Sequence, residues 1–473
     1  MRFSFRPCLS ATAFAVLTAC STLPDYHAPV VETPAHFAGG ANTPGWTTAV
    51  PADAQPRGPW WTVFRDPTLD ALEARVVLSN QNLKKAVAQL QQARALIDYQ
   101  HAGLLPHLTA DVSTVPYRTS ANVVSHSLAG KTIPDHTLGV TASWEPDLFG
   151  RVHDAEAGAR ADSQASQADL EAVRLSVTGD LAADYFTLRS LLQEKGLVAQ
   201  SVSAYAHARD VLAQQLAFGA IDASAVAQAE AQLQSARSAA ADIDAQCATL
   251  RHAMATLLGT PASTTTIDAA PLDASVVPDI PSLLPSQLLQ RRPDVAAAER
   301  RVAAANAAIG EAHAAFYPDL TLSGTAGLES TFLAPWFTAP SLFWSIGPQL
   351  VGTLFDGGLR RATLKNATAA YDGSVADYRQ TVLVALQQVE DALSTLDALS
   401  QEEASQRRAT TAEQLAARLT TNRFQAGAVD YLNVVTTQTT ALEDERVAAQ
   451  LVGRRMSSSV RLIEALGGGW QGG

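Results

Sequence analysis

Side chains that could perform catalysis are scattered along this sequence and form no constellation. The ten histidines lie far apart, and the closest pair, His101 and His107, is separated by a predicted helix end, which favours two surface residues over metal ligands. The sequence contains neither a phosphate-binding glycine loop nor a GxSxG nucleophile elbow. Single carboxylates on predicted helices are typical of solvated faces. We therefore expect a protein that is not an enzyme and that has no metal site and no cofactor.

Cys20 is the one residue for which the sequence predicts a chemical modification. It follows an apolar run from about Ala11 to Leu17, which is too short to cross a bilayer as a helix but is typical of a secretory signal. Leu17-Thr18-Ala19-Cys20 resembles the lipobox of bacterial lipoproteins, in which the cysteine is diacylated and becomes the first residue of the mature chain. Ser21 behind it resembles cargo sent to the outer membrane. A plain signal peptide cleaved nearby is the alternative.

Composition favours long, closely packed helices over a bulky globular core. Of the 473 residues, 47% are hydrophobic but only 6% are aromatic, so the apolar content is mostly Ala, Leu and Val. The net charge of −12 becomes −14 when Arg2 and Arg6 leave with the predicted signal, which argues against nucleic acid as a partner. Cys247 is the only other cysteine that would remain, and we expect it to be a small core residue of a helix.

A helix that leads directly into a two-faced strand occurs twice in the chain. The predicted helix from Pro293 ends at Tyr317-Pro318, and apolar residues then alternate with Thr and Ser from Leu320 to Ala326. About 212 residues upstream, a predicted helix ends at Leu105-Pro106 and a similar strand follows. A second strand and two long helices complete each copy. The sequence therefore predicts an internal duplication.

The long helices that follow each strand pair carry a seam of apolar residues spaced three and four apart, which is typical of antiparallel coiled-coil packing. One seam consists of Tyr371, Val375, Tyr378, Val382, Leu386, Val389, Leu393 and Leu396. At about 1.5 Å per residue, the longest helices would extend roughly 90 to 100 Å.

The predicted organisation can be given as ranges. They are a signal peptide at 1–19, a lipid-anchored extended segment at 20–59, a first repeat at 60–258, a linker at 259–285, a second repeat at 286–467 and a tail at 468–473. The strands are expected at about 108–118, 136–148, 319–330 and 343–355, and the long helices at 151–216, 221–258, 358–425 and 429–466. The predicted helix–strand junction residues are Pro106, Pro318, Gly150, Gly357 and Gly358. Pro348 inside the last strand predicts a local bulge or an edge.

Four strands of this length, each apolar on one face, suit tilted transmembrane β-strands. Four strands cannot close a barrel, and open edges are not tolerated in hydrocarbon, so several subunits must pool their strands. Two chains would give eight strands and a filled interior, whereas three would give twelve and room for a lumen. Any one strand could equally be half-buried in a soluble α+β protein, but four at matched positions in two repeats favour the membrane. The expected fold is mainly α with transmembrane β.

Several motifs resemble the TolC-like outer membrane factors, and within them the NodT-type lipoprotein branch of RND-type efflux systems. The resemblance covers about residues 58–467 and rests on Trp61–Leu69, Arg291–Val295, Phe316–Pro318 and Phe355–Gly358. It implies a homotrimer with a twelve-stranded barrel in the outer membrane of a Gram-negative bacterium, continued by an α-helical barrel in the periplasm. It also implies a belt formed by 68–78, 259–290 and the tail. The implied partners are a periplasmic adaptor protein and an inner-membrane RND pump.

This resemblance predicts the exit duct of a tripartite efflux system, which conducts drugs or other small molecules passively. The exit duct of a type I protein-secretion system is an alternative with the same fold. An alternative from another class is a periplasmic coiled-coil scaffold or adaptor lipoprotein, which would form no pore.

The two helix-turn-helix tips, 216–224 and 423–436, are predicted to close the periplasmic aperture and to contact the adaptor. The residues concerned are Phe218, Gly219, Asp222, Gly427, Asp430, Leu432 and Thr436. The resemblance implies that side chains just after the second tip narrow the pore, which here are Asp430, Leu432 and Thr436. Several relatives have an acidic residue at the Thr436 position, so the resemblance does not extend to a carboxylate ring there. Alternatively, Leu432 is only the first seam residue of its helix.

Overall fold

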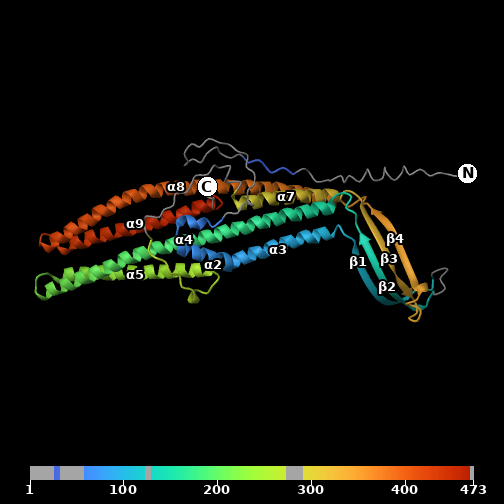
Figure 1. The fold of residues 1–473 in the computed structure, drawn as a ribbon, viewed down its shortest axis with the longest axis horizontal. Coiled ribbons are helices and arrows are strands. Elements are labelled where there is room, and N and C mark those ends of the chain that lie inside the picture. Colours follow the sequence, from blue (N-terminus) through green and yellow to red (C-terminus); the bar gives the residue numbers. More distant parts are fainter. Residues whose placement is uncertain (1–25, 32–57, 123–128, 273–290, 469–473) are drawn as a thin grey trace. The chain divides into compact units, whose positions relative to one another are not determined.

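The computed structural model describes residues 26–31, 58–122, 129–272 and 291–468. Cys20, the predicted signal, residues 273–285 of the predicted linker and residues 469–473 of the predicted tail lie outside these residues. In the first repeat the main elements are α2 (Pro67–Ser79), α3 (Gln81–Ala102), β1 (His107–Arg118), β2 (Thr132–Trp144), α4 (Arg151–Ala217) and α5 (Ala223–Leu257) (Figure 1). In the second they are α7 (Pro293–Ala314), β3 (Asp319–Ser330), β4 (Leu342–Val351), α8 (Leu359–Gln425) and α9 (Tyr431–Ala465). Short 3-10 turns lie at Trp60–Phe64, Ala262–Thr264 and Ala339–Ser341.

The predicted order of elements recurs with matching lengths. The two longest helices, α4 and α8, have 67 residues each, and the helices that return from them, α5 and α9, have 35 residues each. No helix of the described part of the chain is both long and apolar enough to cross a membrane.

The chain forms two compact units that do not coincide with the repeats. Of the described residues, the first contains 26–30, 90–122, 129–166 and 298–378, and the second contains 31, 58–89, 167–272, 291–297 and 379–468. Each unit therefore combines segments from both halves of the chain. The duplication is visible in the order of elements, whereas the packing joins the two copies.

All four strands form one antiparallel sheet in the order β1-β2-β3-β4 within the first unit (Figure 1). The register places Leu108 beside Ala142, then Gly324, then Ile346, so the even-numbered positions form one apolar face. The opposite face carries Thr109, Thr141, Thr325 and Ser345 in the neighbouring row. The apolar face is largely uncovered in the single chain, since Ile346 is 80% exposed. Among the described strands, β1 and β4 each have a neighbour on one side only.

Three strand boundaries differ clearly from the predicted ones. β2 begins at Thr132 rather than at about 136, because its pairing with β1 continues to Arg118. β2 ends at Trp144 rather than at 148, because Pro146 cannot donate a ladder hydrogen bond and the chain turns there. β4 ends at Val351 rather than at 355, because its partner Asp319 is the first residue of β3 and the ladder has no further positions. The predicted bulge at Pro348 is wrong, since its pairing with Leu322 lies in an unbroken register. The predicted edge is confirmed within the single chain, since β4 is the last strand of the sheet.

The core of the second unit is built around the Trp60–Leu69 opening. Phe64 is almost fully buried, and its ring lies 4.7 Å from that of Phe186 on α4. The Trp60 Nε1 donates a 3.1 Å hydrogen bond to Thr178 Oγ1. Asp66 caps α2 by accepting from Thr68 N at 2.9 Å. Cys247 belongs to this core with 1% of its surface exposed, which confirms its predicted place.

Candidate functional site

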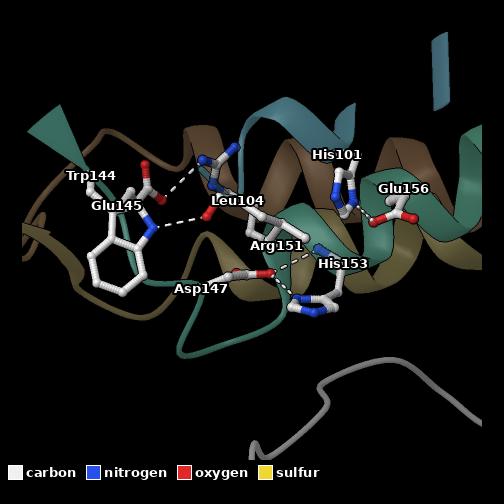
Figure 2. Close-up of polar contacts among 8 residues, drawn as sticks. All are labelled: His101, Leu104, Trp144, Glu145, Asp147, Arg151, His153 and Glu156. Atoms are coloured by element: carbon white, nitrogen blue, oxygen red, sulfur yellow. Dashed lines mark hydrogen bonds and ion pairs between the residues drawn. The ribbon is translucent and has the colours of Figure 1, made fainter. Parts of the chain in front are cut away.

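The first part of the site is the junction where the first strand pair meets its helices, and Figure 2 shows its polar contacts. The chain leaves α3 before Pro106 and enters β1, and Trp144 at the end of β2 closes this corner by donating from Nε1 to Leu104 O at 2.9 Å. Arg151, the first residue of α4, donates to Glu145 at 2.9 Å. Both contacts tie a strand end to a helix end.

Asp147 organises the turn into α4. Its Oδ2 accepts from the backbone N of His153 at 2.8 Å and lies 2.7 Å from the His153 Nδ1 (Figure 2). Burial opposes ionisation of Asp147, but the bonds from His153 outweigh burial and hold its pKa below the ordinary value. His101 lies 3.3 Å from Glu156, so it is a surface residue with a carboxylate partner, as expected. His107 is exposed at the start of β1.

The predicted junction glycines lie where the backbone turns from strand into helix. Gly150 has a φ of 81°, and Gly357 and Gly358 have φ values of 65° and 96°, which side chains other than glycine rarely adopt. Asp356 accepts from Gly358 N at 2.9 Å and from Arg360 Nε at 2.6 Å at the start of α8. The bond from Arg360 lowers the pKa of Asp356. Pro318 immediately precedes β3.

The second part of the site consists of the two helix-turn-helix tips. In the first, Phe218 is 87% exposed, Gly219 has a φ of 71°, and Asp222 caps α5 by accepting from Ser224 N at 2.7 Å. The bond from the Ser224 hydroxyl, and then the bond from Ser224 N, lower the pKa of Asp222. In the second tip, Gly427 has a φ of 72° and Asp430 caps α9. The caps explain why α5 and α9 begin two residues later than predicted.

The residues just after the second tip divide into an exposed set and a buried set. Leu432 is 53% exposed, and Thr436 on the same side of α9 donates from its hydroxyl to Leu432 O at 2.9 Å. Asp430 is also exposed. The buried seam of α9 begins instead with Tyr431 and Val434. Leu432 therefore lies off the seam within its own chain.

Tyr431 is a residue of this region that sequence reasoning missed. It is buried with Val434 against Leu212 of α4 and Ala229 of α5, so it joins the two helical hairpins near their tips. Its ring lies 5.7 Å from Phe424 of α8 in an edge-on arrangement. Burial raises its pKa, and its hydroxyl has no partner among the described residues. Its position directly after Asp430, at the start of a predicted helix, was the feature of the sequence that could have indicated a buried aromatic residue.

A family model described as "Outer membrane efflux protein" matches residues 74–260 and 284–468. The chain belongs to this TolC-like family. The separate match of each half confirms the internal duplication. The efflux protein is 31% identical to the antibiotic efflux pump outer membrane protein ArpC of Pseudomonas putida over 467 residues, which are 98% of this chain and 95% of ArpC. It is 28% identical over 465 residues to the probable outer membrane lipoprotein SilC of Salmonella typhimurium, with 98% of each chain covered.

Among solved structures, the outer-membrane channel OprN matches with a TM-score of 0.85 and 30% identity, covering 96% of this chain and all of OprN. The fold is therefore that of the TolC-like trimeric channels, with four strands per chain. The efflux protein is an outer membrane channel and not an enzyme, as its family indicates. Among the described residues no group of three or more His, Cys, Asp or Glu is placed to hold a metal ion.

Proposed function

We propose that this protein is the lipid-anchored exit duct of a tripartite efflux system, in which a homotrimer works with a periplasmic adaptor and an inner-membrane RND pump. The observation that carries the proposal is the four-stranded sheet with two free edges and one exposed apolar face. Such a sheet needs lipid on one side and further strands at both edges. Three copies supply twelve strands, which leave a lumen for small molecules such as the antibiotics named for ArpC.

The lipid anchor is proposed at Cys20. Its support is the lipobox-like sequence in front of it and the similarity to SilC, which is named as a lipoprotein. Replacing Cys20 by Ser and labelling cells with a radioactive fatty acid tests this step. Label is expected on the wild-type protein and not on the variant, and an unlabelled wild-type protein would exclude acylation.

Deleting the gene distinguishes the efflux duct from the secretion duct. We expect the deletion to raise susceptibility to small toxic compounds and to leave the set of exported proteins unchanged, and we expect the wild-type gene to restore the original susceptibility. Loss of an exported protein with unchanged susceptibility would favour the type I secretion duct.

We further propose that the two tips form the periplasmic aperture and the contact with the adaptor, with Asp430, Leu432 and Thr436 narrowing the pore. The exposure of Leu432 beside the buried Tyr431 supports this role, because an apolar side chain off its own seam is available to neighbours around the pore axis. Opening would separate the hairpins and be driven by a partner that binds the open tips better.

Single-channel conductance tests this aperture. Leu432→Ala and Asp430→Ala are expected to raise the conductance of the purified channel, because each removes volume at the narrowest level. Leu419→Ala is the matched control, since Leu419 on α8 is equally exposed and lies outside the proposed constriction. Equal conductance in the wild type and in both tip variants would contradict the proposed aperture.

A further inference from the structure

The charged side chains on the polar face of the four-stranded sheet are acidic. The odd-numbered positions of the strands contain four acidic side chains and no Lys or Arg, and His107 is the only ionisable nitrogen among them. The acidic residues are Asp111, Asp135, Asp319 and Glu329. The apolar face meets lipid, so this charged face lines the lumen of the barrel.

The four carboxylates differ in their surroundings. Asp319, at the start of β3, lies close enough to Arg151 to interact with its charge. Asp135 and Glu329 lie near the ends of their strands that are farthest from the helices. Asp111 lies in the middle part of β1, is exposed, and has no hydrogen bond or ion pair among the described residues. Asp111 is therefore the uncompensated charge deepest within the membrane part of the chain.

The sheet accommodates the Asp111 carboxylate beside two glycines on the neighbouring strands. The register aligns Asp111 with Gly139, Gly327 and Phe343 across the four strands. A Cβ atom at Gly139 would lie 3.1 Å from Asp111 Oδ1, and one at Gly327 would lie 2.8 Å from Phe343 Cε1. The carboxylate and the ring thus lean inward over two glycines from the two edges of the sheet.

The size of the barrel decides whether such a charge acts on the whole lumen. Twelve strands about 4.8 Å apart and tilted by about 40° enclose a backbone diameter of roughly 24 Å. The three copies of Asp111 lie in one plane by symmetry, roughly 10 Å from the axis, which is about one Debye length at physiological salt. By Coulomb's law, three such charges raise the cation concentration on the axis roughly twofold with screening and roughly eightfold without it.

We propose that Asp111 forms a ring of three carboxylates that makes the membrane part of this channel selective for cations over anions. The proposal rests on the trimeric barrel proposed above. It places a charge filter in the membrane part of the channel, at the middle of β1.

The test is the reversal potential of the purified trimer in a planar bilayer under a potassium chloride gradient. The wild type is expected to prefer potassium. Asp111→Asn is expected to lower the potassium-to-chloride permeability ratio by roughly three- to fourfold at physiological salt and by less at high salt, because salt screens the ring. Asp111→Glu should keep the selectivity, and Asp111→Lys should reverse it.

Ser113→Asn is the matched control, because it enlarges a neighbouring side chain on the same face without a change of charge. Each variant is first shown to be trimeric by its mass in detergent. An Asp111→Asn trimer with the wild-type reversal potential, or a wild type that prefers chloride, would overturn the proposal. A wild type that forms no pore at all would instead contradict the trimeric barrel itself, which separates the two failures.

Discussion

Glu73 on α2 is the most unusual titratable residue of the described chain. It has no exposed surface, and neither carboxyl oxygen has a hydrogen-bond partner among the described residues. Burial, and then the charges of Asp70 and Glu464, raise its pKa to about 9. The pKa of Glu464 is also raised, to about 8, by burial and by Asp180. The native protein therefore holds a proton on Glu73 at neutral pH.

This proton makes the stability of the protein depend on pH. The unfolded chain loses it at pH values above about 4.5 and the folded chain only above about 9, so stability falls as pH rises through that window. At pH 7 the penalty is on the order of 3 kcal/mol. Glu73→Gln, which has no proton to lose, is expected to raise the thermal midpoint strongly at pH 8 and little at pH 5.

The measurement is thermal unfolding in detergent, followed by helical circular dichroism at both pH values. Glu402→Gln serves as the control, since Glu402 is exposed on α8. A Glu73→Gln variant with the same gain at pH 5 and pH 8 would show that the buried carboxyl is not the cause.

The sequence predicted the surroundings of some residues and not of others. The burial of Cys247 followed from its place on an alanine-rich predicted helix. The state of Glu73 did not, because an acidic residue on an amphipathic helix is normally solvated, and only the packing of α2 shows that this one is not. Tyr431 was missed for the same reason, since its burial depends on α4 and α5, which are distant in the sequence.

At the scale of elements, the turn at the second tip depends on Gly427. Its φ of 72° is costly for any residue with a Cβ, whereas Gly373 lies inside α8 with open space around it. Gly427→Ala is expected to destabilise the protein by about 1 kcal/mol, and Gly373→Ala to stabilise it by about the same amount, because alanine favours helix. Thermal midpoints of the two variants check this, and shifts of the same sign would contradict it.

The corner between α3 and β1 depends on the hydrogen bond from Trp144 to Leu104 O. Trp144→Phe removes the 2.9 Å bond to Leu104 O and leaves that carbonyl without its donor, at a cost of about 1 kcal/mol or more. Trp344→Phe is the matched control, because Trp344 is 71% exposed on the apolar face of β4. We expect the thermal midpoint to fall clearly for Trp144→Phe and slightly for Trp344→Phe. An equal fall of the thermal midpoint in both variants would show that the hydrogen bond from Trp144 to Leu104 O does not stabilise the protein.

Element order and strand faces were predictable because helices and strands differ in period, and because each pattern occurs twice. The ends of elements were less predictable. The end of β4 depends on where β3 begins, and the starts of α5 and α9 depend on the caps Asp222 and Asp430. Such ends are set by partners across the sheet or by single side-chain bonds, which periodicity does not report.

At the scale of the whole molecule, one chain carries only part of a conducting structure. Its sheet has two free edges, an apolar face that needs lipid and a polar face that needs water. The compact units combine both repeats, so the duplication supplies the strands in pairs, but neither copy is independent. Conduction is therefore expected only from an assembly of chains.

The most direct test combines the mass of the detergent-purified protein with its activity in a planar bilayer. We expect a complex of three chains that inserts into lipid and opens pores of uniform conductance. A water-soluble single chain that never permeabilises the bilayer would contradict it.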